Sequence, residues 1–275
     1  MKRLLDLELQ KLLQNKTSKV LIIISFILPF FVILLSSFKI NFFGLFTIEL
    51  GEHGIFNFPI IWHITTFFAA FFKIFFAVVV VSMIGNEYSN KTLKQNLIDG
   101  LSKKEFILSK FYTIVFFSLV STLLIFLITL CIGLYYSSID EVGIIFKGSE
   151  FILAYFVKLV GFFSLCLFFG MLLKRSAFAL AFLFIEWIFE WIVFWGAYEI
   201  LDGTEQAQKV KDLMPLESMS NLINQPIQRI IMNMNPDKEN FVYDYAVHWY
   251  EIVIVLIWTA IFIFLSYRLL KKRDL

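Results

Sequence analysis

Four ionisable side chains stand inside long apolar runs, and their types allow acid–base or ion-binding chemistry. They are Lys73, Lys158, Glu186 and Glu190. A charged residue at the centre of a membrane helix costs about 2.5–3.5 kcal/mol, so such residues face protein or water. Glu186 and Glu190 are four residues apart, which places them on one face of a helix. These groups could form ion pairs that fix helix packing, line a polar path for a substrate, or relay protons.

The depths of these residues along their apolar runs predict how they pair. A rise of about 1.5 Å per residue places Lys73 and Glu186 roughly 15 and 18 Å from the outer end of their runs. The same count gives roughly 10 Å for Lys158 and 12 Å for Glu190. The sequence therefore predicts two pairs, Lys73 with Glu186 and Lys158 with Glu190.

Motifs for other chemistries are weak or absent. No HExxH sequence occurs, and no GxxxxGK[ST] phosphate loop occurs. A membrane-embedded enzyme that uses Glu186 and Glu190 as acid and base is an alternative, but it lacks a nucleophile or metal motif. A soft-metal site is a further option, although the spacing of its ligands fits no known pattern. Its members would be His53, His63, His248, Met214, Met219, Met232 and Met234. Cys131 and Cys166 lie in apolar runs and read as small buried hydrophobes.

The elements that must position these residues are membrane helices. The chain has 275 residues, of which 59% are hydrophobic and 17% charged, and its mean hydropathy is +0.80. A soluble domain has roughly 45–50% apolar and about 25% charged residues. A spanning helix needs about 20 apolar residues. Six runs qualify: Val20–Phe38, His63–Ile84, Phe111–Tyr136, Phe151–Leu173, Ala177–Tyr198 and Glu251–Leu269.

The charges between these runs set the orientation. With the N-terminus inside, the inner segments hold 16 of the 24 basic residues and 6 of the 22 acidic ones. The outer segments hold 6 basic and 14 acidic residues, so the inner side carries +10 and the outer side −8. Basic residues favour the cytoplasmic side of a membrane. We therefore expect both ends of the chain in the cytoplasm.

The predicted fold is an all-α integral membrane protein with six transmembrane helices. Residues 1–19 begin with an amphipathic stretch, in which Leu5, Leu9 and Leu12 recur at helical spacing, and this predicts a helix lying in the inner interface. Residues 199–250, between the fifth and sixth spans, form a long outer segment with amphipathic pieces. Residues 85–110, between the second and third spans, form an inner loop.

The inner loop carries the densest pattern of helix signals. Ser89 or Asn90 can cap a short helix over Lys91–Asp99, and Gly100 supplies a left-handed stop. Ser102 with Glu105 three residues later forms a capping box for a second helix, which runs into the third span. The pattern predicts a short, rigid, basic helix between two membrane helices, which suits contact with a partner in the cytoplasm.

This loop resembles the one after the second span in ABC-2 type transporter permeases. The family pattern is an acidic residue, an Asn/Gly-Thr-Leu/Ile-Lys stretch, Gly-x-Ser-Arg/Lys, then Phe and Lys. The matching residues are Glu87, Tyr88, Asn90, Thr92, Leu93, Lys94, Leu97, Gly100, Ser102, Lys103, Phe106 and Lys110. Lys103 stands where Arg is common, which keeps the charge but loses the bidentate geometry. The span layout extends the resemblance over nearly the whole chain.

The resemblance implies a function and partners. The chain would be the permease of a bacterial ABC exporter in the cytoplasmic membrane, and its loop would be the coupling helix that docks on a separate ATPase subunit. Leu93 and Leu97 would supply the apolar contact of that helix, and Lys94 and Lys103 would steer it toward an acidic rim. ATP and Mg²⁺ would bind that subunit, and a second permease copy or a paralogue would complete the transport unit. No nucleic-acid partner is expected. An ion- or proton-coupled transporter without ATP is the other alternative, and its marks would be inverted repeats or broken helices. Neither is visible in the sequence, and the substrate is not indicated.

Overall fold

The computed structural model describes residues 2–36, 40–42, 46–48, 54–137, 141–201, 203–234 and 244–273. Helices dominate these residues, which confirms the all-α membrane class. Five unbroken stretches are long and apolar enough to cross a membrane, and a bent pair supplies a sixth. The spanning helices are α2 (Lys16–Ser36), the pair α3 (Ile60–Phe71) and α4 (Lys73–Ser89), α6 (Lys103–Tyr136), α8 (Glu150–Leu173), α9 (Ser176–Leu201) and α13 (Trp249–Lys271). Each predicted span overlaps one of these.

The second span is broken at Phe72. Helices α3 and α4 meet there at an angle of 43°, and Lys73 becomes the first residue of α4. The structure therefore contains a broken span, which was not visible in the sequence. Sharp kinks usually mark proline or glycine, but the residues around the break are Phe71, Phe72 and Lys73. Pro29, in contrast, lies within the continuous helix α2.

Helix α8 is the central helix of the bundle. It packs against α3, α4, α6, α9 and α13, and most of its side chains are buried. Two glycines allow close approach to its neighbours. A Cβ atom at Gly161 would lie 2.7 Å from Cγ1 of Val255 on α13, and one at Gly170 would lie 3.1 Å from Cβ of Ile84 on α4. The bundle is therefore built around the apolar helix α8, and its glycines allow the neighbouring helices to approach it closely.

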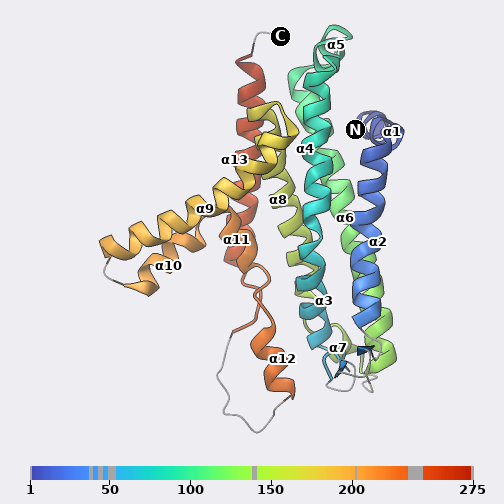
Figure 1. Cartoon of the computed structure of the whole chain (residues 1–275), viewed down its shortest axis with the longest axis vertical. Coiled ribbons are helices and arrows are strands. Elements are labelled where there is room, and N and C mark those ends of the chain that lie inside the picture. Colours follow the sequence, from blue (N-terminus) through green and yellow to red (C-terminus); the bar gives the residue numbers. More distant parts are fainter. Residues whose placement is uncertain are drawn as a thin grey trace.

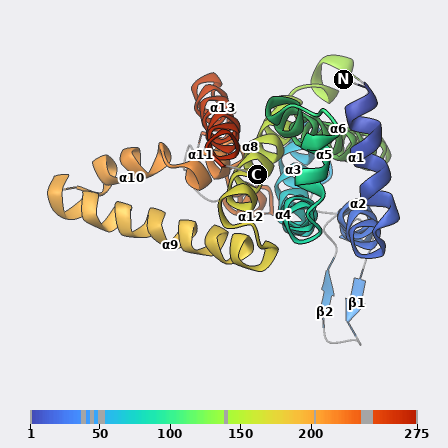
Figure 2. The ribbon, with the colours of Figure 1, turned by 90° about the horizontal axis from the view of Figure 1, so that it is seen from above.

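Helix α9 behaves differently from the other spans. Only Ala179 and Glu190 are buried along its length. Figures 1 and 2 show α9 leaving the bundle obliquely, with α10 (Thr204–Asp212) folded back beside it. Helix α11 (Pro215–Asn221) then returns to pack against α8, α9 and α13. The predicted outer segment thus contains short helices, of which α10 packs beside α9 and α11 packs back against the bundle.

The two ends of the bundle carry different elements. Both ends of the chain lie at one end, together with α1 (Lys2–Gln14) and α5 (Thr92–Ile98) (Figure 1). The other end carries α7 (Val142–Ile145) and α12 (Ile227–Met234). The short strands β1 (Ile40–Phe42) and β2 (Phe46–Ile48) pair antiparallel, with Asn41 opposite Thr47. This small ribbon is an addition to the predicted helical fold.

Candidate functional site

The loop between α4 and α6 folds into one short helix, α5, with well-defined ends. Neither Ser89 nor Asn90 caps it, so that prediction is wrong. Lys91 takes the N-cap position in the left-handed region, at φ 57°, and makes no side-chain capping bond. Thr92, the first helical residue, instead donates its hydroxyl proton to the carboxylate of Glu87 at 2.6 Å.

The C-terminal stop at Gly100 is present as predicted. Gly100 has φ +98°; its N–H donates to the carbonyl of Leu97, and the N–H of Leu101 donates to the carbonyl of Asn96. These two bonds are those of a Schellman motif, which needs a left-handed residue after the helix. Since glycine adopts this conformation without a Cβ penalty, Gly100 fixes the direction in which the chain leaves α5.

The capping box that starts α6 is also present. The N–H of Glu105 donates to Oγ of Ser102 at 3.2 Å, and the N–H of Ser102 donates to Oε2 of Glu105 at 2.9 Å. Helix α6 then continues unbroken from Lys103 to Tyr136. The loop is therefore joined to the third span without a flexible connection.

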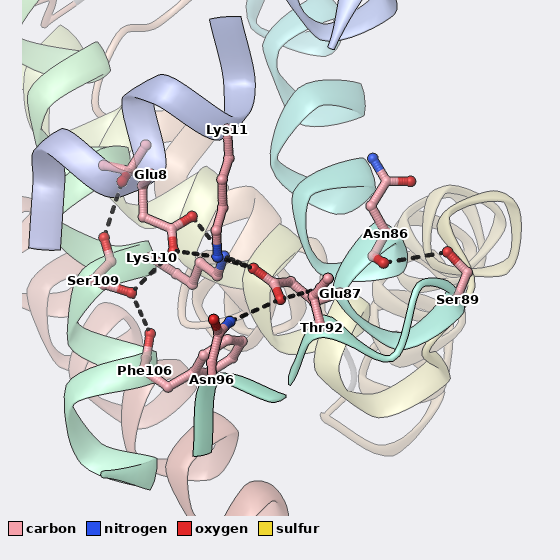
Figure 3. A network of polar contacts seen from close by, with 11 residues as sticks. Glu8, Lys11, Asn86, Glu87, Ser89, Thr92, Asn96, Phe106, Ser109 and Lys110 are labelled. Carbon is pink, nitrogen blue, oxygen red and sulfur yellow. Dashed lines mark hydrogen bonds and ion pairs between the residues drawn. The ribbon is translucent and has the colours of Figure 1, made fainter. Parts of the chain in front are cut away.

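A buried carboxylate holds α5 against the bundle. Glu87 is 4% exposed and accepts four hydrogen bonds (Figure 3). Two come from ammonium groups, Lys110 at 2.8 Å and Lys11 at 3.0 Å. The other two come from α5, where Thr92 donates at 2.6 Å and Asn96 at 3.2 Å. Glu87 thus ties α5 to α1 and α6 as well as to its own helix.

The network continues to the N-terminal helix. The Lys110 side chain is fully buried and donates to Oε2 of Glu8 at 2.6 Å. Ser109 contacts the other oxygen of Glu8 at 3.5 Å. Two lysines and two glutamates therefore balance within one cluster, which meets the requirement that buried charges be paired. We call Glu8, Lys11, Glu87 and Lys110 the loop network.

Sequence reasoning missed Glu8, Lys11 and Arg273. Arg273 donates to the hydroxyl oxygen of Tyr88 at 2.5 Å and to the carbonyl of Leu172 at 3.2 Å. One signal could have revealed Glu8: it is three residues after Leu5 and four before Leu12, so an acidic residue interrupts the apolar stripe of α1. A carboxylate in that position needs a buried cation.

The two faces of α5 differ from the predicted ones. Leu93 is 2% exposed and packs into the permease core. Leu97 is half-buried, whereas Lys94 is exposed. The exposed apolar side chain is Ile98, at 74%. The prediction that Leu93 and Leu97 contact a partner is therefore wrong for Leu93, because that leucine is already used to seat the helix.

The structure also shows the surroundings of three other residues of the loop pattern. Phe106 is fully buried, and Asn90 is exposed. Lys103 is not a free steering charge, because its ammonium donates to the carbonyl oxygens of Lys271 at 3.4 Å and Arg273 at 2.9 Å. It thereby neutralises the C-terminal end of α13, where a helix carries partial negative charge.

The two predicted intramembrane ion pairs do not form. Glu190 accepts the backbone N–H groups of Leu216 at 2.6 Å and Glu217 at 2.9 Å, so it caps the N-terminus of α11. Lys158 donates to the carbonyl of Ser220 at 3.3 Å. The depth estimate failed because it compared spans only, whereas α11 returns to this level and provides backbone partners.

The other pair, Lys73 with Glu186, also has different surroundings. The ammonium of Lys73 lies 4.3 Å from the centroid of the Phe162 ring. Glu186 is half-buried and has no hydrogen-bond or ion-pair partner among the described residues. The structure therefore pairs neither lysine with a glutamate of α9.

The described histidines of the candidate soft-metal site contact other groups of the chain. No group of three His, Cys, Asp or Glu side chains with metal-binding geometry occurs in the part of the chain that the structure describes. Nε2 of His63 lies 2.6 Å from the carbonyl of Asn224, and its ring stacks on Phe151. His53 and the side chains of Met232 and Met234 lie outside the described residues.

This architecture defines a multi-pass helical membrane protein. Its short helix α5 lies at the end of the bundle where both termini are found, and the hydrogen bonds of Glu87 hold it there. The family model described as ABC-2 family transporter protein matches residues 7–275. The chain therefore belongs to the ABC-2 transporter family, and it is a membrane permease component of an ABC transporter. No curated protein is significantly similar to it in sequence. Members of this family generally work with ABC ATPase subunits.

Proposed function

We propose that the chain is the permease subunit of an ATP-driven exporter in the bacterial cytoplasmic membrane, with both ends of the chain in the cytoplasm. Two observations support this orientation. The chain ends and α5 share one end of the bundle, and the segments assigned to that side carry a charge of +10 against −8 on the other. Basic segments are retained on the cytoplasmic side.

In this proposal α5 docks on a separate ATPase subunit, which binds ATP and Mg²⁺. The observation that carries it is the contrast within α5: the helix is clamped by Glu87 and seated by Leu93, yet it presents Ile98 to solvent with 74% of its surface exposed. If a pocket on the ATPase subunit takes up Ile98, this side chain becomes a buried apolar anchor near the centre of the interface, where truncation costs most. Lys94, exposed beside it, would meet an acidic rim.

The transport unit would contain a second permease, either another copy or a paralogue. Helix α9 supports this part of the proposal, because among its 26 residues only Ala179 and Glu190 are buried within one chain. The remaining surface is available to lipid or to a partner permease.

The alternatives are less well supported. The break at Phe72 is a feature of ion-coupled transporters, but membership of the ABC-2 family favours coupling to an ATPase. An enzyme that uses Glu186 and Glu190 is disfavoured because Glu190 is occupied by two backbone N–H groups of α11.

The test is an aspartate substitution at Ile98 in the permease co-expressed with its ATPase. Truncating or charging a central apolar anchor costs more than about 1–2 kcal/mol, which is roughly a five- to thirtyfold weaker affinity. Ile98→Asp should therefore reduce ATPase co-purification and substrate-linked ATP hydrolysis, whereas Ile98→Leu should preserve both. Val142→Asp is the matched control, since Val142 is 66% exposed at the opposite end. Full co-purification with Ile98→Asp would reject α5 as the docking element.

A further inference from the structure

Two adjoining hollows open beside the break in the second span. One has a volume of about 520 Å³ and the other about 530 Å³. They share Lys73, Ile74, Glu217 and Ser220 in their walls. Volumes of this size are typical of small-molecule sites. Lys73 stands where the two hollows meet.

The walls of the two hollows differ in chemistry. The first, which we call the polar hollow, adds Lys158 and the amide side chains Gln208, Asn221, Asn224 and Gln225. The second, the apolar hollow, adds aromatic and aliphatic side chains that include Phe162, Leu183, Phe184 and Trp187. A molecule that filled both would need a polar end and an apolar end.

The lysines at this junction lack carboxylate partners. Lys158 is 4% exposed, and its ammonium donates a hydrogen bond to the carbonyl of Ser220. The ammonium of Lys73 lies 4.3 Å from the centroid of the Phe162 ring. In the part of the chain that the structure describes, no carboxylate oxygen lies within 4.0 Å of either ammonium. Two lysine side chains therefore lie in the wall of the polar hollow, and neither is paired with a carboxylate of the described residues.

The carboxylates of the same hollows are already engaged. Glu217 pairs with Lys211 at 3.1 Å, and Glu190 accepts the N–H groups at the start of α11. Lys73 is also the first residue of α4, directly after the break in the second span. Since an ammonium group in a membrane interior needs a partner or water, an anion is the chemistry that this junction lacks.

We propose that the two hollows bind an anionic amphiphile. Its negatively charged headgroup, a phosphate or a carboxylate, lies between Lys73 and Lys158 in the polar hollow. Its acyl chain or other apolar body lies in the apolar hollow, along Phe162, Leu183 and Phe184. The conclusion that this amphiphile is the transported substrate rests on the proposed export function. The existence of the binding site does not depend on that function.

Binding is measured on the purified full-length permease by native mass spectrometry. The probes are dioleoyl phosphatidylglycerol, dioleoyl phosphatidylcholine and inorganic phosphate. We expect phosphatidylglycerol to bind at least tenfold tighter than phosphatidylcholine. In the Lys73→Gln variant, most of this preference should be lost. Lys209→Gln is the matched control, because Lys209 is an exposed lysine of α10 that lies in neither hollow. Equal affinity of folded Lys73→Gln and wild type for phosphatidylglycerol would overturn the proposal.

A separate variant tests the apolar hollow. Leu183→Trp fills the apolar hollow and should weaken phosphatidylglycerol at least tenfold while leaving any phosphate binding unchanged. If inorganic phosphate competes as strongly as phosphatidylglycerol and Leu183→Trp has no effect, the site takes a free anion and the amphiphile proposal is wrong. The Ile98→Asp variant separates the two proposals. If the permease loses ATPase coupling but still prefers phosphatidylglycerol, the lipid site is supported independently of the proposed function. If the permease couples to its ATPase but does not prefer phosphatidylglycerol, the lipid site is refuted and the proposed function is unaffected.

Discussion

Replacement of Glu87 by glutamine tests whether the loop network, rather than the capping signals, holds α5 in place. Glutamine keeps the size of the side chain but removes the charge that Lys110 contacts at 2.8 Å. One of its two oxygen acceptors also becomes an NH₂ donor, which faces either the lysines or the donors Thr92 and Asn96. Both arrangements leave at least one polar contact of the buried group unsatisfied.

The magnitude follows from the buried contacts. Lys11 is 43% exposed on its side chain, so its pair with Glu87 is screened and contributes little. Lys110 is fully buried, and breaking a buried pair by removing one partner costs about 3–5 kcal/mol. Glu8 remains as a partner for Lys110, so we take the lower bound. Since about 1.4 kcal/mol is a factor of ten, a 3 kcal/mol loss corresponds to roughly a hundredfold larger population of the open loop.

Hydrogen exchange of the backbone amides of residues 92–98 measures that population directly. We expect exchange in Glu87→Gln to be faster by one to two orders of magnitude, with no change in α11. The matched control is Glu205→Gln, because Glu205 belongs to an exposed glutamate–lysine pair whose side chains are 84% and 71% exposed. A change of less than threefold in residues 92–98 would refute the reasoning, and would leave Leu93 packing and the Schellman motif as the restraints on α5.

Two further predictions concern orientation and packing. In intact cells an impermeant maleimide should label Glu205→Cys and not Ser102→Cys, because Glu205 belongs to the acidic outer side and Ser102 to the basic inner side. The wild-type chain is the control for labelling of the native cysteines. The reverse labelling pattern would show that the proposed topology is inverted. Gly161→Ala should destabilise the permease by about 1–3 kcal/mol, because its methyl group would meet Val255 of α13 at 2.7 Å. That loss is measured as a lower Tm of the purified protein. Gly196→Ala, whose methyl group would meet nothing within 4 Å, should not lower the Tm, because alanine favours a helix more than glycine does.

Local signals in the sequence predicted the elements well. Long apolar runs marked the spanning helices, since a backbone in lipid must satisfy its hydrogen bonds within a helix. The Ser102–Glu105 box and the stop at Gly100 depend on neighbouring residues only, so they could be read directly. The family resemblance rested on the same short stretch, and the family model extends it to residues 7–275.

Features that depend on tertiary contacts were not predictable in the same way. Leu93 and Leu97 are four residues apart and share a helix face, but spacing does not say whether that face points to the bundle or to a partner. Glu190 was assigned to Lys158 because nothing in the sequence places the N-terminus of α11 beside it. The break at Phe72 has neither proline nor glycine to announce it.

The contact between Arg273 and Tyr88 has a consequence for biogenesis. Arg273 lies beyond α13, and it bonds to Tyr88 at the entrance of the loop while its carbonyl accepts from Lys103 at the exit. These contacts can form only after α13 has been synthesised and inserted. A nascent permease that still lacks α13 therefore lacks these two restraints on the loop, although the contacts of Glu87 can already form. The loop acquires its full set of contacts only when the last membrane helix is in place.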